Sequence, residues 1–260
     1  MTNTIDMYAY SSAALSLLLA AAPLARAQAL TPPNIINTNG GDPSSKRGLV
    51  YVPSAYTQDD NIWDQSSSDL TWYYNYQAQP TSKYQGTKLQ FVPMLWGAPS
   101  NPTTDMTFYN SVVSQIKSGN NVTYVLGFNE PDGCSSGGSC VSAANAAAVW
   151  KKQMEPLKWQ YGIKLGAPAM TGAPTGFTWM QNFMAACAAI NGNNTGCLID
   201  FIPIHWYGNF EGLASHMGQV NGSYPNVTDM WITEYALANE DLTDTQSFYN
   251  ESAQYFDRLS

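Results

Sequence analysis

Short apolar runs that alternate with helix-like segments are the feature that most restricts how this chain can fold. Seven such runs follow residue 47, at 48–54, 70–76, 89–97, 122–130, 163–170, 198–208 and 229–236. Segments with helical character lie between or after them, at 105–119, 142–162, 175–190 and 244–259. Nearly continuous apolar strands separated by helices are typical of a parallel sheet that is covered by helices. The chain is therefore predicted to be an α/β protein.

The ends of the predicted strands favour a closed barrel over an open sheet. No Gly-x-Gly-x-x-Gly follows the first run, so the fingerprint of a dinucleotide-binding fold is missing. Polar and aromatic residues instead end several runs, at 96–97, 129–130, 205–207 and 234–235. A (β/α)8 TIM-like barrel builds its site at these strand ends. We expect such a barrel, lacking its eighth strand in this chain, because the sequence stops after the helix that follows the seventh run.

Two of the six glutamates end predicted strands, and their pairing suggests the chemistry. Glu130 ends the fourth run and Glu234 lies near the end of the seventh. In a closed barrel the two carboxyl groups would face one another across the mouth. Taken singly, each has another interpretation: Glu130 as a turn residue fixed by Pro131, and Glu234 as a buried carboxyl whose hydrogen bonds are satisfied. Together they match the acid and the nucleophile that a glycoside hydrolase needs.

The motifs around these glutamates resemble those of glycoside hydrolase family 128, the catalytic core of fungal endo-β-1,3-glucanases. "GFNEPD" (127–132) is followed by "WITEYA" (231–236), and the resemblance extends from about Lys46 to the last residue. "VPMLWG", "KLGAPAM" and "IHWYG" fall in the expected order. The resemblance implies a retaining endo-β-1,3-glucanase that acts on fungal-type cell-wall glucan. No His-Glu-x-x-His or comparable metal spacing occurs, so no metal or other cofactor is expected.

The resemblance also assigns roles to residues. It implies that Glu130 is the acid/base and Glu234 the nucleophile. The other candidates would bind or orient the sugar from the strand ends: Asn129, Trp96, His205, Trp206, Tyr207 and Tyr235. The aromatic cluster Trp72, Tyr73, Tyr74 and Tyr76 can be either barrel wall or sugar subsite. His216 is expected on the surface.

The first residues predict secretion. Residues 1–27 contain an apolar stretch of signal-peptide length that ends in Ala25-Arg26-Ala27, a small-x-small cleavage pattern. This stretch is shorter than the about 20 residues that span a bilayer. Residues 28–46 look like a leader or linker, and 47–260 form the catalytic barrel, truncated at its C-terminal end. The expected location is extracellular, either free or associated with the cell wall.

The cysteines and sequons fit an exported protein. Cys134 and Cys140 form one close pair, and Cys187 and Cys197 another. Three disulfide connectivities are possible, and loop closure favours the two local ones. Zinc is the rival reading, but no Cys-x-x-Cys spacing occurs. Five Asn-x-Ser/Thr sequons begin at Asn121, Asn193, Asn221, Asn226 and Asn250.

Composition and motif context exclude several other classes. Only 12% of the residues are charged and the formal net charge is −8, so nucleic acid is not an expected partner. "GCSSG" (133–137) has the letters of a Ser-nucleophile elbow but lacks the strand and helix that must flank it.

The expected partner is a β-1,3-glucan, and the chain is expected to be a monomer. The alternative function is a non-catalytic glucan-binding or cell-surface protein, derived from the enzyme and inactivated by truncation.

Overall fold

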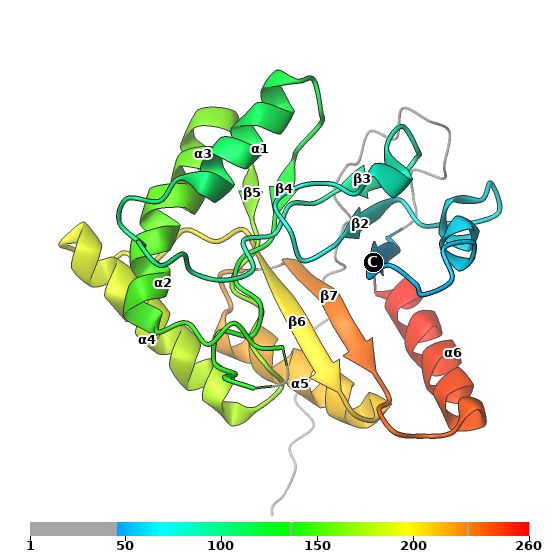
Figure 1. The fold of residues 1–260 in the computed structure, drawn as a ribbon. Coiled ribbons are helices and arrows are strands. Elements are labelled where there is room, and N and C mark those ends of the chain that lie inside the picture. The colour runs from blue at the N-terminus through cyan, green and yellow to red at the C-terminus, as the bar shows by residue number, and fades with distance from the viewer. Residues whose placement is uncertain (1–45, 136, 228, 260) are drawn as a thin grey trace, which may run out of the picture.

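The computed structural model describes residues 46–135, 137–227 and 229–259 (Figure 1). The predicted signal peptide and nearly all of the leader lie outside the described residues. The strands are β1 Gly48–Val50, β2 Trp72–Tyr74, β3 Gln90–Phe91, β4 Tyr124–Val125, β5 Lys164–Leu165, β6 Phe201–Tyr207 and β7 Asp229–Ala236. The α-helices are α1 Thr107–Lys117, α2 Ala143–Val149, α3 Glu155–Tyr161, α4 Pro174–Asn191, α5 Phe210–Ser223 and α6 Leu242–Arg258. Two 3-10 helices, η1 Asp59–Asp64 and η2 Ser82–Tyr84, and a π-helical turn, η3 Trp150–Met154, complete the described elements.

All strand pairs are parallel, and the strands follow one another in chain order. The ladders join β1 to β2 to β3, β4 to β5, and β6 to β7. Single parallel bridges link these pieces, from Met94 to Leu126 and from Gly166 to Phe201. Each of the seven predicted runs contains one strand, so the α/β prediction is confirmed. Six of the seven strands are shorter than their apolar runs, whereas β7 covers the whole of its run.

The described residues do not form a closed eight-stranded barrel. Within 46–135, 137–227 and 229–259 no ladder pairs β7 with β1. Side chains of β2, the second strand of the wall, contact β7 instead. The rings of Trp72 and Trp231 lie 5.0 Å apart, and the Tyr74 hydroxyl donates a 3.1 Å hydrogen bond to the Thr233 carbonyl.

Apolar side chains alternate between the two faces of this wall. Leu126 packs inside with Trp72, Tyr74, Phe201 and Trp231. The preceding residue, Val125, joins a larger cluster between the strands and the helices. Successive side chains of a strand point to opposite faces, which explains why the apolar runs are nearly continuous. Helices α1 to α4 lie on one side of the molecule and α6 stands beside β7 (Figure 1).

The predicted helix at 142–162 is interrupted by one π-helical turn. Ser142 caps its start by accepting a hydrogen bond from the Asn145 amide, and Gly162 ends it with a left-handed φ of 71°. Pro156 has no amide hydrogen to continue the α-helical pattern, and η3 lies directly before α3. The turn keeps Trp150, Gln153 and Met154 buried.

Helix α5 was not predicted from the sequence. Its glycines, Gly212, Gly218 and Gly222, weaken intrinsic helix propensity. Asn209 caps the helix by accepting a hydrogen bond from the Gly212 amide, and Leu213, Met217 and Val220 bury its apolar side. The burial of these apolar side chains therefore stabilises a helix whose intrinsic propensity is low. His216 lies on the same helix and is buried, so the prediction of a surface histidine is wrong.

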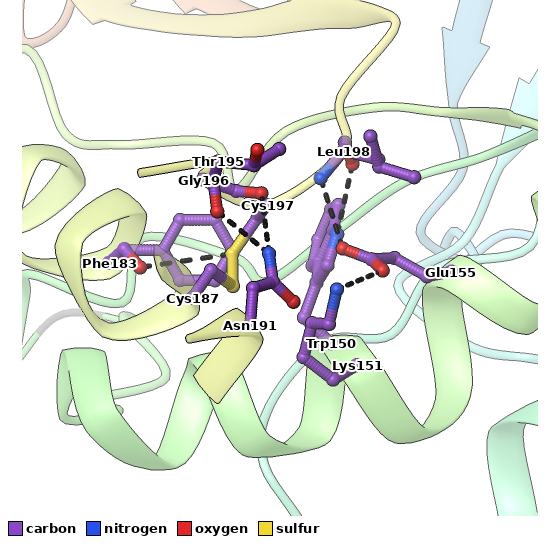
Figure 2. The surroundings of a disulfide bond; sticks show 10 residues. All are labelled: Trp150, Lys151, Glu155, Phe183, Cys187, Asn191, Thr195, Gly196, Cys197 and Leu198. Carbon is purple, nitrogen blue, oxygen red and sulfur yellow. Dashed lines mark hydrogen bonds and ion pairs between the residues drawn. A yellow bond between two sulfur atoms is a disulfide. The ribbon is translucent and has the colours of Figure 1, made fainter. Parts of the chain in front are cut away.

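The structure pairs Cys187 with Cys197 and Cys134 with Cys140, as loop closure predicts. Figure 2 shows the first of these disulfides between α4 and the segment that leads into β6. Both backbone groups of Leu198 are held there, since the Trp150 indole donates to its carbonyl and the Glu155 carboxylate accepts from its amide, at 3.0 and 3.1 Å. The strand that carries His205 is thus fastened to the helical layer.

No helix among the described residues is long and apolar enough to cross a membrane.

Candidate active site

Glu130 stands just beyond β4 in a strained backbone conformation. Its φ is 41°, in the left-handed region that non-glycine residues seldom occupy. The Glu130 amide donates to the Ala169 carbonyl at 2.7 Å, and its carbonyl accepts from the Gly133 amide at 2.9 Å. Pro131 fixes the next φ angle. Strain of this kind persists only where neighbouring contacts enforce it, and it is frequent at functional sites.

The loop closed by Cys134 and Cys140 supplies those contacts. The Ser139 amide donates to the Asn129 carbonyl at 2.9 Å, and the Val141 amide donates to the Pro131 carbonyl at 3.1 Å. The Asn129 side chain donates to the Gly137 carbonyl at 3.1 Å. Residues on both sides of Glu130 are therefore hydrogen-bonded to the disulfide loop.

A β-bulge aims Glu234 at the same site. Ile204 pairs with Ile232, but the next residue, His205, pairs with Glu234, so Thr233 is the extra residue of β7. Register partners in a ladder present their side chains on the same face. His205 and Glu234 consequently lie together on the inner face. Without the bulge, His205 would pair with Thr233 and not with Glu234.

His205 connects the two glutamates. Its Nδ1 lies 3.0 Å from Oε1 of Glu130, and its Nε2 lies 3.5 Å from Oε1 of Glu234. The imidazole is only 1% exposed, and the Glu234 side chain 8%. The Glu130 side chain is 15% exposed, and the burial of His205 and Glu234 strengthens the electrostatic interactions within the cluster. The predicted pair of carboxyl groups is thus brought together, with a histidine between them.

Three tyrosine hydroxyls donate hydrogen bonds to Glu234. Tyr76 reaches Oε1 at 2.8 Å, Tyr74 reaches the same oxygen at 3.3 Å, and Tyr207 reaches Oε2 at 2.8 Å. Burial raises the pKa of all three phenols, and the nearby Glu234 carboxylate raises each further. They remain neutral donors at ordinary pH. Such donors suit an ionised carboxylate.

Tyr74 and Tyr76 are the site residues that sequence reasoning left undecided. Trp72 and Tyr74 face the interior, whereas Tyr73 packs outside with Tyr51 and Tyr84. The period of two along β2 could have placed Tyr74 inside. Tyr76 follows the strand with a φ of 61°, which periodicity does not anticipate.

Two predicted sugar-binding residues do not lie with the carboxylates. The Trp206 ring stacks on His216 of α5 at 5.4 Å, and its indole donates to the Asn209 carbonyl. The Tyr235 ring packs against Phe248 and Phe256 of α6. Each is next to an inward-facing residue, so strand alternation turns it toward the helices.

The other candidates do lie at the site. Asn129 precedes Glu130, and its Oδ1 is buried without a protein hydrogen-bond partner. Trp96 accepts a 2.9 Å hydrogen bond from the Asn129 amide through its carbonyl, and its side chain is partly exposed. His205 and Tyr207 contact the carboxylates directly, as described above.

Glu130, His205 and Glu234 could also present ligand atoms to a cation. One atom from each lies within 4.8 Å of the others. Hydrogen bonds from the tyrosines and from His205 already account for this clustering. The clustering is therefore accounted for by contacts within the protein.

The comparisons with known proteins agree with this geometry. The sequence model described as glycosyl hydrolase catalytic core matches residues 48–260. The alkali-sensitive linkage protein 1 of Schizosaccharomyces pombe is 31% identical over 202 residues, which are 76% of this chain. The chain spans about a third (32%) of the length of that relative.

Solved structures of glycoside hydrolase family 128 share the fold. A curdlan-specific exo-β-1,3-glucanase of subgroup III from Blastomyces gilchristii, crystallised with glucose, is 26% identical, with a TM-score of 0.63 over 82% of this chain and 84% of that one. An endo-β-1,3-glucanase of subgroup II from Sorangium cellulosum is also 26% identical, with a TM-score of 0.61 over 80% of this chain and 81% of that one.

Proposed function

Since the chain belongs to the glycosyl hydrolase catalytic core family, we propose that it is a secreted, retaining endo-β-1,3-glucanase that acts on cell-wall β-glucan. The resemblance to family 128 is confirmed by the family match and by the structural neighbours. The observation that carries the proposal is the convergence of Glu130 and Glu234 on His205. β-1,3-Glucan is the substrate class of the two similar enzymes described above.

The spacing of the carboxyl groups supports retention of configuration. An oxygen of Glu130 and an oxygen of Glu234 lie within 4.8 Å. Retaining enzymes hold their carboxyl groups about 5–5.5 Å apart, whereas inverting enzymes separate them by about 6.5–9.5 Å to admit a water molecule. A separation of this size supports direct attack by Glu234 on the sugar.

The reaction follows from the environments of the two groups. Glu234, held by three phenol donors, attacks the anomeric carbon as Glu130 passes a proton to the departing glycosidic oxygen. The carbon–oxygen bond breaks and a glycosyl ester forms on Glu234. Glu130 then takes a proton from water, which attacks the same carbon and releases Glu234. His205 holds Glu130 in place through both steps.

The parallel order of the strands supports a TIM-like (β/α)8 architecture for the catalytic unit. Secretion is supported by two disulfides, which persist in oxidising compartments. All five sequon asparagines are exposed, so each is accessible to a glycan.

One finding favours the alternative of a non-catalytic glucan-binding protein. The name of the Schizosaccharomyces pombe relative describes a linkage protein and states no hydrolytic activity. The two functions make different predictions for a soluble and an insoluble glucan. The enzyme releases reducing ends from laminarin, whereas the binding protein only co-sediments with curdlan.

The deciding experiment measures laminarin hydrolysis and curdlan binding on the purified chain. Wild type, Glu130→Gln and Glu234→Gln are compared with Glu211→Gln, a matched change at an exposed glutamate of α5. The proposal expects turnover that is lost in the first two variants and kept in the third. Early proton NMR of the product should show the β-anomer. Binding without turnover in the wild type would establish the alternative function.

A further inference from the structure

Asp132 ends the "GFNEPD" motif, two residues after Glu130, and takes no part in the proton transfers described above. Its carboxylate accepts three hydrogen bonds from residues that follow β5. The Thr171 amide donates to Oδ1 at 2.9 Å, and the Thr171 hydroxyl donates to Oδ2 at 2.5 Å. The Thr175 hydroxyl, in the first turn of α4, donates to Oδ2 at 3.2 Å. Asp132 thus joins the turn after β4 to the segment that leads into α4.

One of these bonds replaces a bond that the strand ladder lacks. The Ala169 amide donates to the Phe128 carbonyl at 2.9 Å, and the Glu130 amide donates to the Ala169 carbonyl at 2.7 Å. In a regular parallel ladder the Thr171 amide would donate next, to the Glu130 carbonyl. That carbonyl accepts a bond within the following turn instead, because the chain turns at Glu130 with a φ of 41°. The Asp132 carboxylate accepts from the Thr171 amide in its place.

The segment that Asp132 holds also pairs with the strand that carries His205. Met170 forms a parallel bridge with Ile204, the residue before His205. The His205 ring in turn lies 3.0 Å from Oε1 of Glu130. Residues 169–171 therefore lie between the backbone of Glu130 and the strand of its imidazole partner. By binding this segment, Asp132 helps to fix the position of the Glu130 carboxyl group relative to His205.

The surroundings of the Asp132 carboxylate are closely packed. A Cβ added at Gly176, in the first turn of α4, would lie 2.8 Å from Cβ of Met170 and 3.5 Å from Oδ2 of Asp132. No side chain larger than that of glycine fits there without displacing its neighbours. The N-cap residue of α4, Ala173, supplies no side-chain cap, and the helix dipole favours a negative charge at this end. The carboxylate is therefore both fixed and stabilised, as a group that positions another must be.

We propose that Asp132 is a positioning residue for the acid/base Glu130. It replaces the Glu130 carbonyl as acceptor for the Thr171 amide, so the chain can turn at Glu130 and direct its carboxyl group to His205 and the leaving group. The inference rests on the proposed function. Loss of Asp132 should impair proton donation by Glu130 and spare attack by Glu234, which lies on β7 and is held by tyrosine hydroxyls.

The kinetic test compares two leaving groups on one sugar. Dinitrophenol leaves a β-laminaribioside without a proton, whereas phenol needs the general acid. Asp132→Ala and Asp132→Asn are compared with wild type, and asparagine keeps an oxygen for the Thr171 amide. Asp200→Ala is the matched control, because Asp200 accepts a 2.9 Å bond from the Leu165 amide directly before β6. It makes the same kind of contact between neighbouring strands, at their other end.

We expect Asp132→Ala to lower kcat/KM for the phenyl glycoside by about 10- to 100-fold, since a misplacement of about 1 Å can cost about 10²-fold. The dinitrophenyl glycoside should change by a few-fold at most, and Asp132→Asn should recover most of the loss. Asp200→Ala should lower the melting temperature and affect both glycosides alike. Equal losses for the two glycosides in Asp132→Ala, or no recovery in Asp132→Asn, would overturn the proposal. Thr171→Val, which removes one donor to the carboxylate, provides the same comparison if Asp132→Ala does not fold.

A spectroscopic measurement separates this proposal from the proposed function. The chain has two histidines, His205 and His216, so their ring signals are readily assigned by NMR. The His205 ring signals should shift in Asp132→Ala and not in Asp200→Ala, whereas those of His216 should stay in place in both. Unchanged His205 signals in Asp132→Ala would overturn the positioning role. If the wild type hydrolyses no glycoside, the proposed function fails, and these spectra still decide whether Asp132 holds Glu130 against His205.

Discussion

The hydroxyl of Tyr76 lies 2.8 Å from Oε1 of Glu234, across 158 residues of sequence. This contact joins the segment that follows β2 to the end of β7. It also carries backbone strain, since Tyr76 has a φ of 61°. The strain is understandable if the contact positions the nucleophile.

Tyr76→Phe should therefore lower glucanase activity while the fold is kept. A hydrogen bond to a charged group contributes about 1.5–3 kcal/mol, which corresponds to about a 10- to 100-fold loss of kcat/KM. Tyr74 and Tyr207 still hold Glu234, so activity should not vanish. The measurement is steady-state kinetics on laminarin, with a thermal melt to check folding. Tyr56→Phe, at a tyrosine that is 67% exposed, is the control, and equal kinetics in the two variants would contradict the role of Tyr76.

Azide should distinguish the nucleophile from the acid/base. With a nitrophenyl laminaribioside, Glu234→Gly plus azide should form the α-glycosyl azide, because azide attacks once from the side of the missing carboxylate. Glu130→Ala plus azide should form the β-glycosyl azide, because azide displaces Glu234 from the glycosyl ester. Both variants should lose at least about 10²–10⁴-fold activity on laminarin. NMR of the azide products provides the measurement, and the opposite pair of anomers would reverse the assigned roles.

The sequence predicted the parts of the site that depend on a strand end and a motif. Glu130, Glu234, His205 and Tyr207 lie at the ends of long apolar runs, where parallel strands of one sheet deliver their last side chains to one edge. The local disulfides were predictable for another reason: short loops close at low entropic cost.

The features that were not predicted are the orientation of two side chains and local departures from regular backbone geometry. Trp206 and Tyr235 lie at the expected strand ends but face the helices, and the motif alone did not indicate which side chains of these strands point inward. No sequence pattern predicts the bulge at Thr233 or the positive φ angles of Tyr76 and Glu130. Helix α5 was hidden by its glycines, because its stability comes from packing.

Removing the two disulfides should have different consequences. Cys134→Ser with Cys140→Ser frees the loop whose backbone holds residues 129 and 131, so kcat should fall. Cys187→Ser with Cys197→Ser loosens the α4–β6 connection, where neither cysteine contacts the carboxylates. Each change should lower the free energy of unfolding by about 2–3 kcal/mol. Chemical denaturation and laminarin kinetics, run on both double variants, give the comparison. A drop in kcat confined to the Cys187–Cys197 variant would be the reverse of this expectation.

Stability should fall in mild acid because of His216. Its ring is buried against Trp206 and Phe177, with centroids 5.4 and 5.8 Å away, and burial lowers its pKa below the usual 6.5. Below about pH 6.5 the unfolded chain binds a proton that the folded chain does not, so the free energy of unfolding decreases as the pH falls from 6.5 toward the lowered pKa. The slope from this group is at most about 1.4 kcal/mol per pH unit. Urea denaturation between pH 7.5 and 5 should show a shallower dependence for His216→Gln than for wild type. Parallel curves for the two proteins would mean that His216 is protonated as readily in the folded chain as in the unfolded one.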